Sequence, residues 1–214
     1  MTDFEDLRAG RVLVATPGLR DPNFARSVVL VLEHDRGGTL GIVLNRPLDV
    51  TIVEVLPDWT GEVSEPERLF DGGPVASEAA LAVGLLTTAA EQSPPPDHTD
   101  DDTSTDTDTA TDTDEGDGPV GWRTVYGRVG LVDLDAPAPL LNGALSGLRI
   151  FAGYAGWSPG QLEVEIEEGS WVVVDGADGD LTTRTPDALW SQVLRRQRGN
   201  LRLLSTCPRD PSQN

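Results

Sequence analysis

A run of low-complexity sequence in the middle of the chain most limits what can fold. Residues 91–118 read EQSPPPDHTDDDTSTDTDTATDTDEGDG, and their only apolar side chain, prolines aside, is one alanine. Such a composition cannot bury enough apolar surface to offset the entropy lost on ordering. The sequence on each side has the composition of folded protein. We therefore predict a disordered acidic surface-loop insertion within one compact domain, not a linker between two.

The boundaries of the domain follow from that insertion. We predict a single domain over residues 1–205, interrupted by 91–118, and a flexible tail over 206–214. The chain of 214 residues is long enough for one self-sufficient core. Its single cysteine, Cys207, excludes a disulfide framework and any cysteine-based zinc site.

Charge and hydropathy limit the partners and the location. The chain has 36 acidic residues against 16 basic ones, all arginine, and a net charge of −20. The inserted segment holds 11 of the acids and no arginine, so the rest of the chain carries only −9. Nucleic acid is therefore not an expected partner, because phosphate binding requires clustered positive charge. With no apolar run near the ~18 residues of a membrane span and no apolar core at the N-terminus, we expect a cytoplasmic protein without membrane contact.

The sequence before the insertion is typical of short strands. Runs rich in β-branched residues alternate with turn residues, and DRGG at 35–38 predicts a hairpin. Residues 50–59 predict a short helix, capped by Thr51 and ended by Pro57. The run at 77–86 is open, because its composition favours a helix and its length allows a strand. The predicted strands are 11–15, 27–35, 39–46 and 68–75, the last entering a Gly-Gly turn.

Helices become more frequent after the insertion. Ser158, Pro159 and Gln161 have the spacing of a capping box with serine as N-cap. The following residues, 162–169, alternate apolar and charged side chains with period two, as a strand would, but we favour the helix. Strands dominate, with hairpins early and helices late, which indicates an α+β fold with a mixed sheet. Further strands are predicted at 122–133 (one or two), 148–156 and 171–175, and helices at 137–145 and 185–197.

Four segments, taken in order, carry a family resemblance. They are LVATPGLRDPNFARSVVLVLEH (13–34), GTLGIVLNRPL (38–48), FDGGPV (70–75) and RIFAGYAGWSPGQLEVEIEEGSWVVVD (149–175). Together they resemble the YqgE/AlgH family of small bacterial proteins. The resemblance implies a single compact domain with a largely antiparallel, bulged sheet flanked by helices. It brings no catalytic residues, and such proteins are labelled uncharacterised or transcriptional regulators. The acidic insertion and the run at 77–86 depart from the family pattern.

Polar residues gather just before the second predicted strand. Asp21, Asn23, Arg26 and Ser27 lie at a loop–strand junction, where binding groups are often found. The alternative is local turn chemistry, with an Asp-Pro-Asn turn and an arginine that pairs with an acid.

A hydrolase interpretation joins Ser27 and His34 with Asp35 or Asp71. It is disfavoured because the serine and the histidine lie on opposite faces of one strand, about 23 Å apart when extended. No nucleophile-elbow motif is present. Metal binding at Glu33 and His34 lacks a third protein ligand. We therefore predict no metal and no cofactor, and His34 stays a candidate ligand-binding residue.

Two further segments suggest an anion site. Asn45 and Arg46 end a strand directly before the short predicted helix. Gly72 and Gly73, within the sequence DGGP, are able to present backbone N–H groups to an anion as a nest. An arginine facing that nest would favour a small anionic ligand. The alternative is a hairpin turn with ordinary ion pairs.

The stretch GYAGWSPGQLE at 153–163 predicts a rigid corner between a strand and a helix. Its glycines permit positive φ or close backbone approach, and the helix N-terminus presents free N–H groups. Tyr154 and Trp157 are candidates for the walls of an adjoining crevice. Alternatively, Trp157 fills the edge of the core.

No complete catalytic set emerges from these residues. The sequence indicates a binding or regulatory module that recognises a small anionic molecule or a protein partner. The alternatives are an unrecognised, hydrolase-like enzyme and the DNA-binding regulator that the family label suggests.

Overall fold

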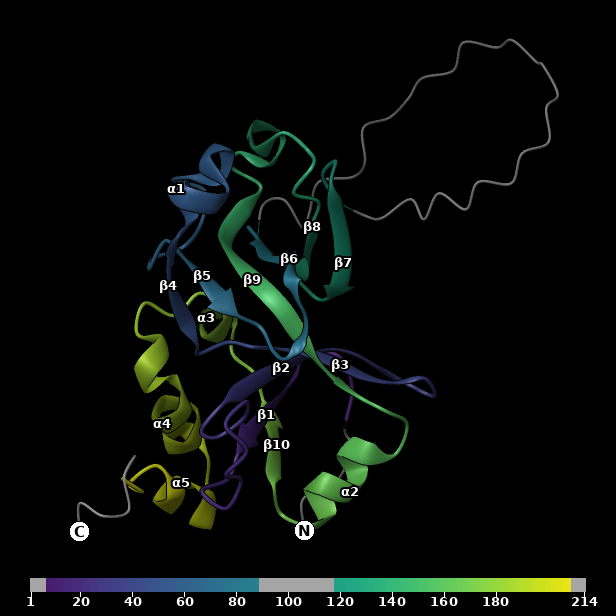
Figure 1. Cartoon of the computed structure of the whole chain (residues 1–214), viewed down its shortest axis with the longest axis vertical. Helices are drawn as coiled ribbons and strands as arrows, with labels where there is room; N and C mark the ends of the chain where they lie inside the picture. The colour runs from purple at the N-terminus through teal and green to yellow at the C-terminus, as the bar shows by residue number, and fades with distance from the viewer. Residues whose placement is uncertain (1–6, 89–117, 209–214) are drawn as a thin grey trace, which may run out of the picture.

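A long strand, β9 (Leu145–Trp157), joins the two halves of the molecule in the computed structural model (Figure 1). Along most of its length β9 pairs with β6 (Val75–Leu86). Its last residues pair with β3 (Gly38–Val43), which belongs to the other half. The strand predicted at 148–156 is therefore confirmed and is the element that connects the whole sheet.

The structure describes residues 7–88 and 118–208. Nearly all of the predicted acidic insertion and most of the predicted tail lie outside these ranges, so both stay predictions. Within the described ranges, no helix is long and apolar enough to cross a membrane.

The other strands are short, and most coincide with the β-branched runs of the sequence. They are β1 (Arg11–Ala15), β2 (Val28–Asp35), β4 (Pro47–Thr51), β5 (Arg68–Asp71), β7 (Trp122–Tyr126), β8 (Val129–Val132) and β10 (Trp171–Asp175). The helices are α1 (Ile52–Val55), α2 (Gln161–Glu167), α3 (Asp178–Leu181), α4 (Pro186–Arg196) and α5 (Asn200–Leu204), with 3-10 turns at Pro57–Trp59 and Ala138–Leu141.

Ten strands of the described chain form one sheet. Their order is β10-β1-β2-β3-β9-β6-β8-β7, with β5 beside β9 and β4 beside β5. Neighbouring strands are antiparallel except for β5 and β9, which run parallel. Register shifts interrupt the β2–β3, β4–β5, β6–β9 and β7–β8 pairings. The predicted α+β domain with a mixed, largely antiparallel, bulged sheet is confirmed.

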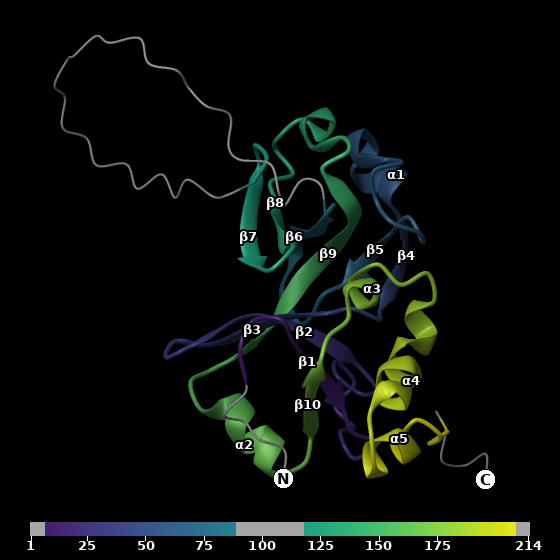
Figure 2. The same ribbon diagram turned by 180° about the vertical axis from the view of Figure 1, so that it is seen from behind.

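Successive side chains of β2 point to opposite faces of the sheet and enter two separate hydrophobic cores. Val28 and Leu30 lie in a cluster that also contains Trp190 of α4. Val29 lies in a second cluster with Trp171 and the inner face of α2. Figure 2 shows α2 and the α4–α5 pair on opposite sides of β1 and β10. The helices therefore flank the sheet, as predicted.

The open run at 77–86 is part of strand β6. Its second half lies between β8 and β9, where Ala82 and Val83 are buried. Pairing on both edges and burial of its side chains stabilise a strand there. This tertiary environment outweighs the helix propensity of the alanines.

The residues after Ser158 form helix α2, as favoured. Leu162 and Ile166, four residues apart, are buried on its inner face. The helix begins later than predicted, because its N-cap is Gly160, with a φ of 77°. The Ser158 N–H donates to the side chain of Gln161 at 3.1 Å, so only half of the predicted capping box is present.

The two other helices predicted after the insertion had different outcomes. The segment 137–145 contains only a 3-10 turn, because Pro139 donates no backbone hydrogen bond and Gly143 turns the chain with a φ of 77°. The helix predicted at 185–197 is confirmed as α4, with Thr185 as its N-cap.

Gly72 and Gly73 let the chain after β5 pass close against β9. A Cβ at Gly72 would lie 2.2 Å from the Gly153 carbonyl oxygen. A Cβ at Gly73, where φ is 144°, would lie 2.4 Å from backbone atoms of Tyr154. The glycines of the DGGP motif therefore allow its backbone to touch the backbone of the GYAG motif. Side chains at this contact would force the two segments apart.

We expect Gly73→Ala to lower the free energy of unfolding by about 3 kcal/mol, from backbone strain and overpacking together. The matched variant Gly61→Ala also has a positive φ, 85°, but its Cβ would meet nothing within 4 Å. It should lose only about 1 kcal/mol. Urea unfolding followed by circular dichroism measures both, and equal losses would contradict the close contact.

Candidate functional site

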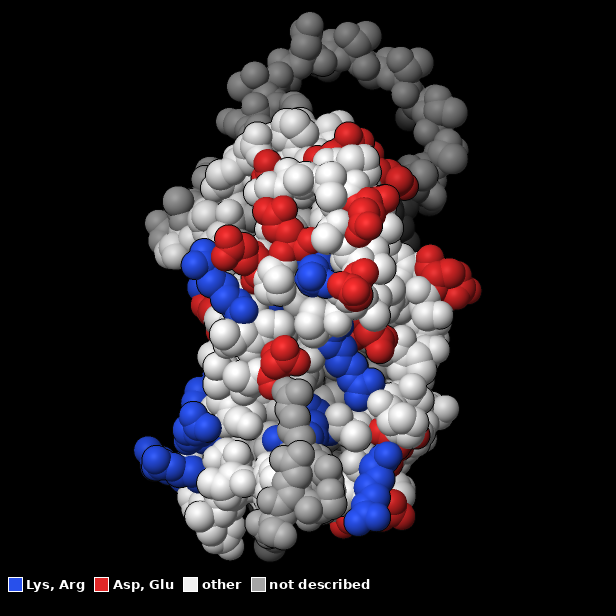
Figure 3. Space-filling model, turned by 60° about the vertical axis from the view of Figure 1, so that its left-hand side comes forward, with Lys and Arg blue, Asp and Glu red and all other residues white. Residues whose placement is uncertain are grey.

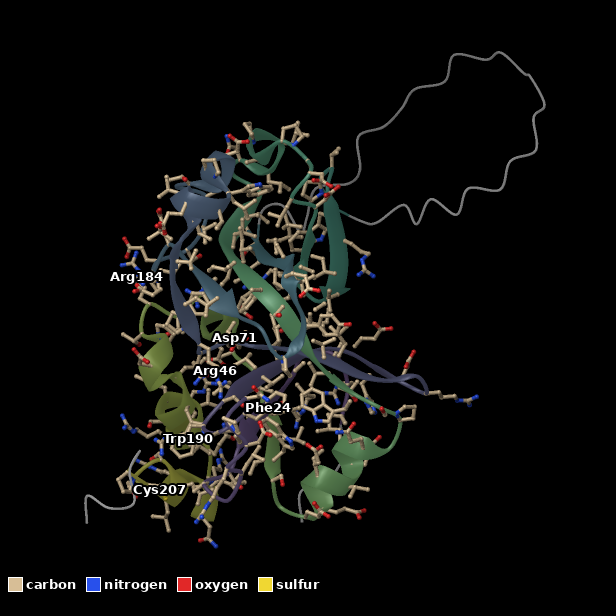
Figure 4. All side chains as sticks on the ribbon, in the orientation of Figure 1. Phe24, Arg46, Asp71, Arg184, Trp190 and Cys207 are labelled. Carbon is tan, nitrogen blue, oxygen red and sulfur yellow. The ribbon has the colours of Figure 1, made fainter. Side chains whose placement is uncertain are left out.

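Three of the predicted site residues, Arg26, Asn45 and Arg46, lie together at one end of the sheet. The antiparallel pairing of β2 with β3 brings the start of β2 beside the end of β3. With Asp187 and Trp190 of α4, they line a hollow of about 200 Å³. We call it the arginine hollow; the labels of Arg46 and Trp190 locate it in Figure 4.

Asn45 positions the loop that carries Arg26. Its Oδ1 accepts the Val28 N–H at 2.9 Å, and its Nδ2 donates to the Arg26 carbonyl at 3.0 Å. Arg26 has a φ of 57°, which is uncommon for a residue other than glycine. The two hydrogen bonds hold this backbone, so Asn45 is a positioning residue of the hollow.

The Arg26 side chain stacks on Trp190. The guanidinium carbon lies 3.8 Å from the indole centroid, which is the geometry of a cation–π contact. The Arg26 Nη1 donates to the carbonyls of Cys207 and Pro208 at 3.0 and 3.2 Å. The indole N–H donates to the Ala15 carbonyl at 2.7 Å. Arg26 therefore links its loop to α4 and to the residues after α5.

Within the described residues, Arg46 makes only long polar contacts. Its Nη2 lies 3.4 Å from the Ala25 carbonyl, and its Nη1 lies 4.0 Å from the Asp71 carboxylate. By comparison, Arg196 binds Asp180 through two hydrogen bonds of 2.6 Å. A guanidinium has five N–H donors. Arg46, whose side chain is 23% exposed, therefore retains donors for a ligand in the hollow.

A second cleft, of about 610 Å³, adjoins the arginine hollow and shares Asp187 with it. One wall is formed by residues 47–49 of β4, and the other by residues 184–188 at the start of α4. Pro66 and Arg68 complete the lining. We call it the β4 cleft. Figure 3 shows the side of the molecule that carries α4, with acidic side chains mostly in its upper half and basic ones mostly below.

Arg149 joins, from within the core, the backbone beside Pro66 to the backbone beside Arg184, two lining residues of the β4 cleft. It is fully buried, and its Nη2 donates at 3.0 Å to the carbonyls of both Glu65 and Thr183. The guanidinium carbon lies 4.2 Å from the centroid of the Phe70 ring. In the described residues, Nε and Nη1 have no hydrogen-bond partner. Burial lowers the pKa of Arg149 to about 10, so the side chain is still charged at neutral pH.

Asp21 and Asn23 form a turn outside the hollow. The Asp21 Oδ1 accepts the Asn23 N–H at 2.8 Å, and both residues are exposed. Local turn chemistry, the alternative weighed for this segment, accounts for the pair.

Gly72 and Gly73 do not form the predicted anion nest. The Gly72 N–H donates to the Ala152 carbonyl at 2.9 Å, and the Gly73 N–H donates to Asp71 Oδ1 at 3.1 Å. Both donors are used within the protein, so this prediction is wrong. The glycines instead permit the close backbone contact with β9.

Ser27 and His34 are not brought together. Ser27 precedes β2 and is fully buried, and its Oγ has no hydrogen-bond partner in the part of the chain that the structure describes. His34 lies near the far end of β2, with its Nδ1 2.8 Å from Thr39 Oγ1 and its Nε2 4.0 Å from Glu163. Among residues 7–88 and 118–208, no three His, Cys, Asp or Glu side chains gather to hold a metal.

Trp157 and Tyr154 take part in the packing of the sheet. Trp157 is 5% exposed, stacks on Phe24 and meets Trp171 edge-on. One oxygen of Glu165 accepts the indole N–H groups of both tryptophans, at 3.0 and 2.8 Å. Tyr154 packs against the core on the other side of the sheet. Trp157 thus fills an edge of the core, the alternative weighed for it.

Several residues around these hollows were missed by sequence reasoning, among them Trp190, Arg184, Arg149 and the Asp187 that lines both hollows. Trp190 lies in the apolar stripe of α4, where it resembles any core residue. Arg184 is an exposed loop residue without a local signal. Arg149 does carry one: it is the only charged residue of β9, and a charge inside a buried strand is rare.

Comparison with known proteins identifies the family. A family model described as AlgH-like matches residues 12–202. The chain is a member of the AlgH-like family. A UPF0301 protein of Streptomyces coelicolor is 47% identical over 214 residues, covering 100% of this chain and 98% of the relative. A UPF0301 protein of Mycobacterium avium is 42% identical over 208 residues, covering 97% and 92%.

Two solved structures resemble this AlgH-like protein. The crystal structure of a Corynebacterium diphtheriae protein is 32% identical, with a TM-score of 0.77 over 94% of this chain and 93% of that chain. The solution structure of AlgH from Pseudomonas aeruginosa is 23% identical, with a TM-score of 0.57 over 93% of both chains. The second likeness concerns the fold alone. The family resemblance read from the sequence is confirmed.

We expect Asn45→Ala to lower the free energy of unfolding by about 2 kcal/mol, because it leaves the Val28 N–H and the Arg26 carbonyl without their partner. Arg46→Ala removes only long contacts and should cost less than about 1 kcal/mol. Urea unfolding of the two variants measures the difference. Equal losses would assign Arg46 a structural role and argue against a spare cation in the hollow.

Proposed function

We propose that this AlgH-like protein is a binding module whose arginine hollow recognises a small anionic group, a carboxylate or a phosphate. The observation that carries the proposal is the state of Arg46. Its guanidinium lines the hollow, and none of its polar contacts within the described residues is shorter than 3.4 Å. A partly buried cation with weak protein partners favours an anionic ligand.

The surroundings of Arg46 favour one anionic group over a polyanion. A planar guanidinium binds carboxylate or phosphate oxygens through two parallel N–H bonds. The hollow is small, and Asp187 lines it. Asp71 lies 4.0 Å from Arg46. These two carboxylates oppose the accumulation of negative charge, so a single group is accommodated better than a chain of phosphates.

Titrations with inorganic phosphate and with acetate test the proposal. A ligand at 100 Kd adds about 2.7 kcal/mol to the free energy of unfolding, which raises Tm by several degrees in a domain of this size. We expect such a shift for the full chain at constant ionic strength. Arg46→Ala should abolish it, and Arg46→Lys should weaken it, because lysine lacks the planar fork.

Arg36→Ala is the matched control for charge. It removes one arginine from the exposed tip of the β2–β3 hairpin and should leave the anion-induced shift unchanged. A shift that survives in Arg46→Ala, or that Arg36→Ala reduces equally, would mean that anions act through the overall charge and not at the arginine hollow.

A further inference from the structure

The charges that line the arginine hollow and the apolar lining of the β4 cleft suggest which anion binds. Resting on the proposed function, we propose that the ligand is an α-amino acid with an apolar side chain. Its carboxylate meets Arg46, its ammonium meets Asp187, and its side chain lies in the β4 cleft. Three features of the described residues support this: charges of both signs in a small hollow, the position of Asp187, and the apolar surface next to it.

The sizes of the two hollows suit different parts of one ligand. Pockets for small molecules usually measure about 300–1,000 Å³. The arginine hollow, at about 200 Å³, is smaller than that and holds little more than a charged group. The β4 cleft, at about 610 Å³, lies within the usual range. A ligand whose charged end fills the hollow therefore has room for its remaining atoms in the cleft.

Asp187 lies where the two hollows meet, because it lines both. Pro186 and Ala188, its neighbours on α4, line the cleft, whereas Trp190 lines the hollow. In Figure 4, Trp190 and Arg46 of the hollow and then Arg184 of the cleft follow one another upward along the side that carries α4 and β4. A ligand that extends from one hollow into the other would pass this carboxylate.

The arginine hollow presents charges of both signs. The polar contacts of Arg46 are 3.4 and 4.0 Å long, and its planar fork suits a carboxylate. Asp187 is exposed in the same hollow. An ionised carboxylate has about four positions for hydrogen-bond donors, so Asp187 can accept an ammonium in addition to its other contacts. Because the hollow is small, a ligand that meets both charges must carry its own two charges close together, as an α-amino acid does.

The charged residues of the β4 cleft other than Asp187 already have partners of opposite sign. Arg68 pairs with Asp49 at 2.6 Å, and Arg184 pairs with Glu65 at 3.5 Å. A surface of this kind gains free energy by burying apolar atoms, and it has little to offer a second charged group. The ligand's side chain is therefore expected to be apolar. The rest of the lining is mostly apolar and consists of Pro47, Leu48, Pro66, Thr185, Pro186 and Ala188.

Isothermal titration calorimetry of the full chain with four related compounds, at constant ionic strength, tests the inference. L-Leucine carries all three groups, glycine lacks the side chain, 4-methylpentanoate lacks the ammonium, and 3-methylbutylamine lacks the carboxylate. We expect leucine to bind most tightly. Burying one CH2 lowers Kd about fourfold, so glycine should bind at least about tenfold more weakly. 4-Methylpentanoate should bind about fivefold more weakly, and 3-methylbutylamine should not bind measurably.

The matched variants Asp187→Asn and Asp49→Asn test the partner of the ammonium. Each removes one negative charge from the lining of the cleft, but only Asp187 also lines the hollow. We expect Asp187→Asn to raise the Kd of leucine about fivefold and not to raise that of 4-methylpentanoate, because only leucine carries an ammonium. Asp49→Asn should change the Kd of leucine by less than about twofold.

Leu48→Ala tests the position of the side chain. It removes apolar surface from the cleft, so we expect it to raise the Kd of leucine about threefold and to leave that of glycine unchanged. Arg46→Ala should abolish the binding of both amino acids.

The inference and the proposed function fail in different ways. If leucine binds no more tightly than 4-methylpentanoate or glycine, or if Asp187→Asn weakens leucine and 4-methylpentanoate equally, the inference is overturned. If phosphate and acetate bind through Arg46 and leucine does not bind, the inference is overturned and the anion site stands. If none of these compounds binds, both proposals are overturned.

Discussion

The arrangement of the whole sheet depends on one close contact between backbones. Where the chain leaves β5, it crosses β9 so tightly that neither Gly72 nor Gly73 has room for a Cβ. This contact accompanies the parallel pairing of β5 with β9, the exception in an otherwise antiparallel sheet. β5 in turn holds β4. One wall of the β4 cleft is therefore positioned by glycines that bind no ligand themselves.

Two arginines of this acidic chain are held by aromatic rings. Arg26 stacks on Trp190 and Arg149 on Phe70, and the chain contains no lysine. A guanidinium is less strongly hydrated than an ammonium and lies flat on an aromatic ring. Arginine can therefore be buried beside these hollows at a lower desolvation penalty. The local positive charge arises from this packing and not from the composition of the chain, which carries −20 overall.

The sequence predicted elements best where hydropathy period, length and caps agreed, as for β1 and α4. It left 77–86 open because alanine favours a helix locally, and only pairing with β8 and β9 decides for a strand. Part of the site was also predictable: Arg26, Asn45 and Arg46 flank consecutive antiparallel strands, whose ends must meet. The role of Asn45 was not, because its amide binds a backbone whose left-handed turn at Arg26 leaves no local signal.

The glycine nest shows a different limit of sequence reasoning. A Gly-Gly turn indicates that N–H groups can converge, but it does not reveal whether another strand already accepts them, as Ala152 of β9 does for Gly72. For Trp190, the sequence predicted the burial of the side chain but not its partner. Its position in an apolar helix stripe predicts burial, while its stacking on Arg26 depends on a loop far away in the sequence.

The position of Arg149 has a consequence for the rigidity of one side of the β4 cleft. Its one Nη2 joins the backbone beside Pro66 to the backbone beside Arg184, so these two lining segments can part only if a buried cation gives up a carbonyl acceptor. The spacing of these two segments is therefore fixed in the resting protein. A protein that is already in its binding-competent form needs no prior opening step, and its affinity is not reduced by the population of a rare conformer. A ligand that enters between these two segments would meet a shape that is already set on this side of the cleft.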